Sequence, residues 1–201
     1  MINDLDTTLK TLLVREIPQV HADTVAISFD PPNDQFPSGG VTLPAIDLFL
    51  YDVRENHDLR SNEGTTRRES SGTAQRWMPP VRIDCSYLIT AWPKGTQNVE
   101  DEHYLLGQVM TVLLRYSELP QEMLHGELKK NQELPLPTAV LQPGHLQSLG
   151  EFWQALGGKP KVALNYTVTI AVQPFEEPVE VPLVRATDTE LKPNQAEGIH
   201  P

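Results

Sequence analysis

The stretch from Val162 to Val172 alternates without a fault between large apolar residues and small or polar ones. The large side chains stand at every second position, namely Val162, Leu164, Tyr166, Val168, Ile170 and Val172. A period of two is that of a β-strand with one buried face. Because the apolar face of such a strand must be covered, this stretch predicts a sheet with helices packed on it.

Other stretches predict further strands of this sheet. Residues 24–29 and 82–92 also alternate with a period of two. Residues 45–53 are apolar on both faces, which predicts a central strand or an interface. On one face stand Ile46, Leu48 and Leu50, and on the other Phe49, Tyr51 and Val53. Residues 134–141 contain two prolines and are expected to form an edge strand at best.

Three helices are predicted from apolar spacing and capping residues. Residues 2–16 carry apolar side chains three and four apart, and Pro18 should end this helix. Asn98, followed by three acidic residues, is a helix N-cap, and Pro120 lies beyond the end of that helix. Ser148 and Glu151 match a capping box for a short third helix. The fold class is therefore α+β, a mixed, mainly antiparallel sheet of about four to five strands with two to three helices.

Two segments differ in composition from the rest. Residues 57–76 are polar and carry too little apolar surface to offset the entropy of ordering, so a mobile loop is expected there. Residues 174–201 are rich in proline and acidic residues and predict an extended arm or tail. Residues 1–173 are then expected to form a single domain.

Charge and apolar content exclude several kinds of partner. Sixteen basic and twenty-seven acidic residues give a net charge of −11, which repels a phosphate backbone, so no nucleic acid is expected as a partner. No apolar run approaches the roughly 20 residues that span a bilayer, and direct membrane insertion is not expected. The N-terminal residues are acidic and amphipathic, unlike a signal peptide, which predicts a cytoplasmic place of assembly.

Catalytic chemistry finds little support in the sequence. The six histidines are scattered without metal-ligand spacing, and no phosphate-binding loop is present. Cys85 lies on an apolar strand face, as a buried structural thiol does. We therefore predict no catalytic, cofactor or metal site and no enzymatic activity. One alternative stays open, a small hydrolase that uses Asp52, Glu55 and His57; a salt-bridged strand end is the interpretation that the sequence favours.

Five segments, taken in order, resemble a known family. They are MINDLDTTLKTLL, PAIDLFLYDVRENHDLRSNE, PPVRIDCSYLITAW, DEHYLLGQVMTVLLRYSELP and FWQALGGKPKVALNYTVTI. The set resembles the N-terminal domain of cap, or tail-terminator, proteins of contractile injection systems, the phage-tail-like particles of the antifeeding-prophage and virulence-cassette type. The resemblance covers most of the chain from Met1 to Gln173.

The resemblance implies a structural protein with a tail-terminator-like fold. It implies a homo-oligomeric ring, expected to be a hexamer, at the end of the tail distal to the baseplate, where it stops growth of the inner tube and the sheath. The implied partners are the terminal sheath and tube subunits, in a particle that is either released from the cell or attached to a membrane. A baseplate or connector adaptor of the same particle is the alternative.

A ring needs two different complementary patches on each subunit. The strand that is apolar on both faces, followed by a charged segment, suits one of them. The predicted subunit or sheath interface consists of Tyr51, Asp52, Arg54, Glu55, Asn56, Leu59, Arg60, Asn62 and Glu63.

Overall fold

The computed structural model describes residues 1–37, 39–68, 73–95, 98–131, 135–142, 148–175 and 177–182. The chain divides into two compact units. Unit 1 comprises Met1–Ser61 and Pro80–Pro174, and unit 2 comprises Asn62–Pro79 and Phe175–Pro201. Each unit is described by itself.

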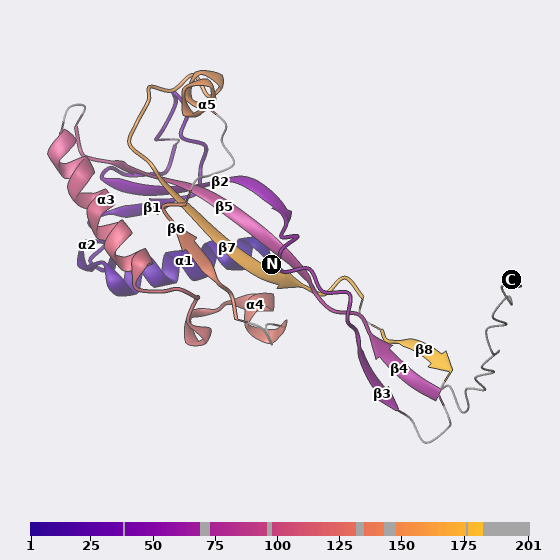
Figure 1. Cartoon of the computed structure of the whole chain (residues 1–201). Helices are drawn as coiled ribbons and strands as arrows, with labels where there is room; N and C mark the ends of the chain where they lie inside the picture. The colour runs from indigo at the N-terminus through magenta and orange to yellow at the C-terminus, as the bar shows by residue number, and fades with distance from the viewer. Residues whose placement is uncertain are drawn as a thin grey trace, which may run out of the picture. The chain divides into compact units, whose positions relative to one another are not determined.

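Unit 1 is built on a five-stranded sheet in the order β1-β2-β5-β7-β6 (Figure 1). The strands are β1 (Ala26–Ser28), β2 (Ala45–Glu55), β5 (Val81–Trp92), β6 (Thr138–Val140) and β7 (Leu164–Val172). β1 pairs with β2 in parallel, and the other three pairings are antiparallel. The predicted mixed, mainly antiparallel sheet is confirmed, as is the edge position of the strand that follows Pro135 and Pro137.

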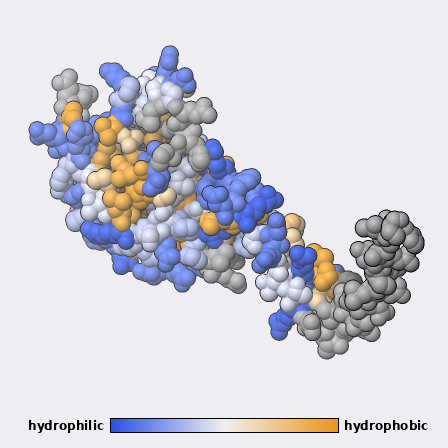
Figure 2. Space-filling model, in the orientation of Figure 1, coloured by the Kyte–Doolittle hydropathy of each residue, from blue (hydrophilic) through white to orange (hydrophobic). Residues whose placement is uncertain are grey.

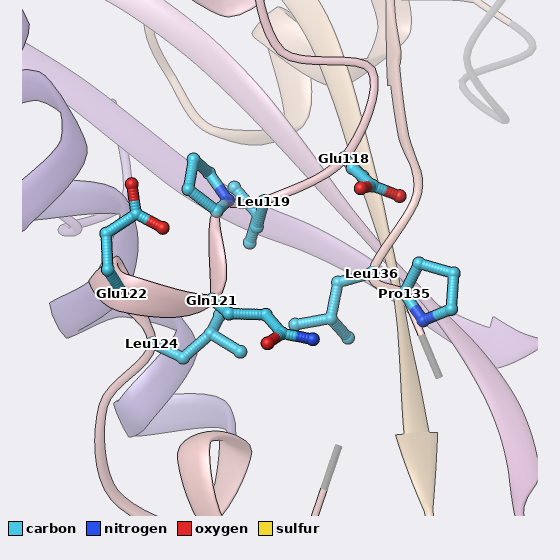
Figure 3. A pocket seen from close by; sticks show the side chains of 8 residues that line it. Glu118, Leu119, Gln121, Glu122, Leu124, Pro135 and Leu136 are labelled. Atoms are coloured by element: carbon cyan, nitrogen blue, oxygen red, sulfur yellow. The ribbon is translucent and has the colours of Figure 1, made fainter. Parts of the chain in front are cut away.

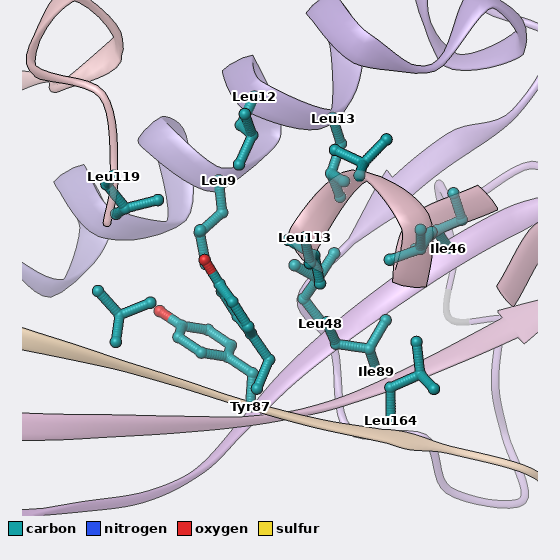
Figure 4. Packing of buried hydrophobic residues seen from close by; sticks show 14 of the residues in the cluster. Leu9, Leu12, Leu13, Ile46, Leu48, Tyr87, Ile89, Leu113, Leu119 and Leu164 are labelled. Atoms are coloured by element: carbon teal, nitrogen blue, oxygen red, sulfur yellow. The ribbon is translucent and has the colours of Figure 1, made fainter. Parts of the chain in front are cut away.

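Two long helices cover one face of this sheet. α1 (Ile2–Glu16) and α3 (Val99–Leu114) bury leucines and valines against the apolar side chains of β2, β5 and β7. Figure 4 shows Leu9, Leu12 and Leu13 of α1 pointing toward the sheet. Each large apolar side chain buried in this way contributes roughly 1.5–3 kcal/mol to stability. The core of unit 1 therefore lies between α1, α3 and the sheet.

Capping residues position the helices as the sequence predicts. The side chain of Asn98 accepts a hydrogen bond from the Asp101 amide at the start of α3. Ser148 does the same for the Glu151 amide, at 3.2 Å, at the start of α5 (Leu149–Ala155). Three short helical segments were not predicted, α2 (Pro18–His21), η1 (Gln121–Met123) and α4 (Gly126–Asn131).

The other face of the sheet is covered over part of its area. The rings of Phe49 on β2 and Phe152 on α5 lie 6.2 Å apart, and Phe36 packs 4.4 Å from Trp92, between ring centroids. Leu88 on β5 is completely buried. Both faces of the first half of β2 are therefore buried, as expected for a central strand.

A β-bulge at Tyr51 changes the faces predicted for the end of β2. Leu50 pairs with Tyr87, but the next register pair is Asp52 with Ser86, so β2 carries one extra residue here. Beyond the bulge, Val53 pairs with Cys85 and shares its face. The prediction that Phe49, Tyr51 and Val53 share one face was therefore wrong at Val53, because an inserted residue shifts the alternation by one position.

Unit 2 contains a small sheet that the sequence analysis missed. β3 (Thr65–Arg68), β4 (Thr73–Trp77) and β8 (Val179–Pro182) pair antiparallel in the order β3-β4-β8. Strands thus occupy parts of the loop predicted at 57–76, whose residues 69–72 lie outside the described residues, and part of the arm predicted at 174–201. Backbone pairing orders these polar strands without an apolar face. Residues 183–201 of the predicted arm lie outside the described residues.

Candidate assembly interface

The exposed end of β2 is organised by the carboxylate of Asp84 on the neighbouring strand. Asp84 accepts hydrogen bonds from the Asn56 amide nitrogen at 3.0 and 3.1 Å and from the Thr169 hydroxyl at 2.6 Å. Asp84 on β5 is also the residue opposite Arg54 in the antiparallel pairing of β2 and β5. β2, β5 and β7 are thereby tied together by one carboxylate on the face away from α1 and α3.

Asn56 fixes the turn in which β2 ends. Its side-chain oxygen accepts a hydrogen bond from the backbone amide of Leu59 at 2.9 Å. Its backbone amide donates to the backbone carbonyl of Arg82 at 2.8 Å. With the bonds to Asp84, the side chain uses both its donor and its acceptor within the subunit. Asn56, one of the predicted interface residues, therefore positions this turn through its contacts within the subunit.

The two arginines of this segment form ion pairs at the surface. The Arg54 guanidinium lies 2.6 Å from the Asp52 carboxylate, and that of Arg60 lies 3.4 Å from Glu55. The hydrogen bond that Arg54 donates to the Asp52 carboxylate raises the pKa of Arg54. The Arg54 and Arg60 side chains are 46% and 56% exposed, so both charges can be reached by a partner. Exposed pairs of this kind contribute only about 0–1 kcal/mol to folding.

Apolar surface accompanies these charges. Val53 and Leu59 are each 46% exposed. Tyr51, at the bulge, is half-buried and donates a hydrogen bond to Asn165 at 3.3 Å. Val53, Arg54, Leu59 and Arg60 are therefore the accessible residues at this end of β2, called here the charged strand end, with Val53 on the face of Cys85 and Arg54 on the opposite face. The last two predicted interface residues, Asn62 and Glu63, are exposed and belong to unit 2.

The groups considered for hydrolysis do not converge. Asp52 pairs with Ser86 and Glu55 with Ile83, so the two carboxylates stand on opposite faces of the sheet. His57 is exposed in the following turn. Burial raises the pKa of the Cys85 thiol to about 11, which keeps it protonated and unreactive. Within the described ranges, no three metal-ligating side chains come together.

One carboxylate is buried without a partner. Asp47 on β2 is fully buried, and neither of its oxygens has a hydrogen-bond partner among the described residues. Burial raises its pKa to about 7, and the nearby charge of Asp30 adds to the effect. The nearby hydroxyl of Ser28, the register partner of Asp47 on β1, offsets only part of this rise and does not make a hydrogen bond of normal geometry to the carboxylate. Asp47 therefore affects stability rather than recognition, because no partner can reach it.

A surface pocket of about 340 Å³ lies near the start of β6 (Figure 3). Glu118 and Glu122 stand on opposite sides of Leu119 in this pocket. Glu122 also lies 3.6 Å from Arg15 of α1. The pocket is lined by Glu118, Leu119, Pro120, Gln121, Glu122, Leu124, Pro135 and Leu136. None of these residues belongs to the predicted interface.

Sequence reasoning missed exposed apolar residues on two other elements. On α3, Val99, Tyr104 and Leu114 are 57%, 59% and 56% exposed. On the small sheet, Trp77 is 41% and Val179 is 54% exposed. Figure 2 shows apolar surface in the region of α3 and a smaller apolar patch beside hydrophilic atoms on the small sheet. The exposed apolar residues of α3 could have been predicted from the sequence, because Val99, Tyr104 and Leu114 fall outside the apolar stripe that the helix buries.

No described helix combines the length and the apolar character needed to cross a membrane.

Comparison with known proteins gives one family and several similar solved structures, two of which are described next. A search of curated protein sequences found no match. The sheath/tube terminator of the extracellular contractile injection system PVC, in its extended state, is 28% identical over 98% of this chain and 65% of its own, with a TM-score of 0.66. The tube terminating cap of the anti-feeding prophage is 27% identical over 95% of this chain and 61% of its own, with a TM-score of 0.62.

The chain spans less than two thirds of each of these two proteins. Residues 4–186 match the family described as the Pvc16 N-terminal domain, a range that includes both sheets. The match covers most of the sequence, and the two similar structures agree with it in fold. This chain therefore belongs to the Pvc16 N-terminal domain family.

Proposed function

We propose that this protein caps the tail of a contractile injection system. The observation that carries the proposal is the likeness of nearly the whole chain, at a TM-score of 0.66, to a sheath/tube terminator. A second likeness, to a tube terminating cap, supports the same role. The protein would act as a structural component without catalysis, in contact with the last sheath and tube subunits.

The proposed assembly is a ring of identical subunits, with six copies as the expected number, at the end of the tail distal to the baseplate. A ring is built from heterologous contacts, in which one patch on each subunit meets a different patch on the next. The charged strand end, formed by Val53, Arg54, Leu59 and Arg60, is one such patch. Its exposed apolar side chains would supply contact area, and its arginines would set register and partner choice.

Growth of the tube and the sheath stops in this arrangement if the ring covers the growing end of both. A ring that covers the terminal layer of sheath and tube subunits denies the next layer its contacts. Assembly would take place in the cytoplasm, and the finished particle would then be released or become attached to a membrane.

Electron microscopy of particles assembled with and without this protein tests the proposal. We expect tails of uniform length with a gold-labelled copy at the end distal to the baseplate. Without the protein, tails should vary in length or carry open sheath ends. Label at the baseplate end would favour the adaptor alternative, and normal tail lengths in its absence would contradict the capping role.

A further inference from the structure

The small sheet of unit 2 buries very little apolar surface. Its strands are short, and among their described side chains Ala74 alone is buried. Trp77 and Val179 remain 41% and 54% exposed. A sheet of this size becomes stable when an apolar face packs on another element. The exposed residues of this sheet thus form a surface that is incomplete without a partner.

Arginines accompany the apolar residues on both faces of the small sheet. Thr65 pairs with Trp77, and Arg67 lies two residues along on the same face as Thr65. Arg76 pairs with Val179, which places these two side chains together on the other face. The carboxylate of Glu180 on β8 lies on the Arg67 and Trp77 face, because Glu180 and Arg67 both pair with Gln75. The Arg76 and Val179 face carries no acidic residue of these three strands, although the whole chain has a net charge of −11.

The start of α3 offers a matching combination on unit 1. Val99 and Tyr104 are exposed apolar residues, and Glu100 and Asp101 between them are exposed acids. A hollow of about 140 Å³ lies beside them, and it is lined by Pro44, Pro93, Lys94, Asp101, Tyr104 and Leu105. The start of α3 thus combines two exposed acidic residues with two exposed apolar ones.

We propose that the small sheet of one copy docks on the start of α3 of a second copy. Arg76 would meet Glu100 and Asp101, and Val179, on the same face of the sheet, would cover Tyr104. The two surfaces are different, so the contact is heterologous, and its repetition closes a ring when the rotation allows it. This inference rests on the proposed ring and names the contact between its subunits.

A charge exchange between two variants tests the contact. The sheet variant is Arg76→Glu, the helix variant is Glu100→Lys with Asp101→Lys, and the control is Lys129→Glu with Lys130→Glu on α4. We expect wild type and control to self-associate in analytical ultracentrifugation. Each test variant alone should lose association, with the apparent dissociation constant raised about tenfold or more. An equimolar mixture of the two test variants should restore it, because each altered surface then meets a complementary one.

Because lysines in the first turn of α3 oppose the helix dipole, circular dichroism must show that the helix variant is folded. Tyr104→Ser provides a second test that leaves the charges and the N-cap in place, and it should also weaken association. Three results would overturn the inference. The sheet variant could associate like wild type, the mixture of the two variants could stay monomeric, or the wild type could be monomeric at its highest soluble concentration. Labelled wild type at tail ends under any of these results would leave the capping function standing.

Discussion

The side-chain amide nitrogen of Asn56 donates to both carboxylate oxygens of Asp84, at 3.1 and 3.0 Å, and so ties the end of β2 to its neighbour β5. The charged strand end owes its shape to this contact, because the same side chain accepts from the Leu59 amide and holds the turn that carries Leu59 and Arg60. Asn56 thus positions the turn, and Arg60, four residues further on, is exposed there and is the residue proposed to contact a partner.

Asn56→Ala should destabilise the protein by about 1–2 kcal/mol, because the Asp84 carboxylate loses two donors and keeps only Thr169. Urea denaturation followed by circular dichroism measures the loss. His57→Ala, one position further in the exposed turn, is the control and should change the unfolding free energy by less than about 0.5 kcal/mol. An Asn56→Ala protein as stable as wild type would show that Asn56 does not hold the turn.

Arg54→Glu combined with Arg60→Glu should impair capping and leave the fold intact, because both side chains are exposed and their ion pairs contribute little to stability. Tail length in electron micrographs gives the effect, and circular dichroism gives the fold. The matched control is Arg115→Glu, an exposed arginine that pairs with Glu16 at 3.1 Å elsewhere on unit 1. If the double variant still produces tails of normal length, the charged strand end is not a capping interface.

The stability of the wild type should fall as the pH rises from about 4 to about 7. The pKa of Asp47 is raised from 3.8 to about 7 in the folded protein, so the folded state holds this proton more tightly than the unfolded state. The stability that the neutral carboxyl provides is complete below pH 3.8 and is lost as the pH passes through 7. A shift of this size corresponds to at most about 4 kcal/mol.

Asp47→Asn removes this titration and should flatten the pH dependence over the same range. Unfolding free energies from urea titrations at several pH values make the comparison, with Asp58→Asn in the exposed turn as the control. A variant whose pH profile follows that of wild type would mean that the Asp47 carboxylate finds a partner in solution.

Two glycines should respond to alanine in opposite directions. Gly107 lies within α3, and a Cβ there would meet nothing within 4 Å, so Gly107→Ala should stabilise by about 0.5–1 kcal/mol. Gly126 has a φ of +53°, and a Cβ there would overlap the Asp4 carboxylate, so Gly126→Ala should destabilise by more than about 1 kcal/mol. Thermal unfolding of both variants checks the signs, and a destabilised Gly107→Ala would reveal a contact on the outer face of α3.

Much of unit 1 could be predicted because its elements bury one clear face. β5 and β7 alternate in sequence as they do in the sheet, and α1 shows its buried stripe. The capping residues Asn98 and Ser148 act as their side-chain chemistry predicts. In each case local preference and burial favour the same structure.

The remaining structure depends on pairing that local sequence does not encode. No glycine or proline near Tyr51 indicates a bulge in the sequence, and the bulge is seen in the pairing register of β2 with β5. β3 and β4 are polar strands held by backbone hydrogen bonds, so hydrophobic periodicity cannot find them. The hydrogen bonds of Asn56 could not be predicted either, because its partners Asp84 and Leu59 are brought to it by strand pairing and by the turn.

The pairing of Val81 with Val172 at the ends of β5 and β7 has a consequence for the order of folding. β4 precedes Val81 and β8 follows Val172 in the chain, so the formation of the large sheet brings together the two segments that must pair in the small one. Closing the long loop between β4 and β8 in an unfolded chain would carry a large entropic penalty. The small sheet should therefore form late, at the high effective concentration that the folded strands of unit 1 impose on its two halves.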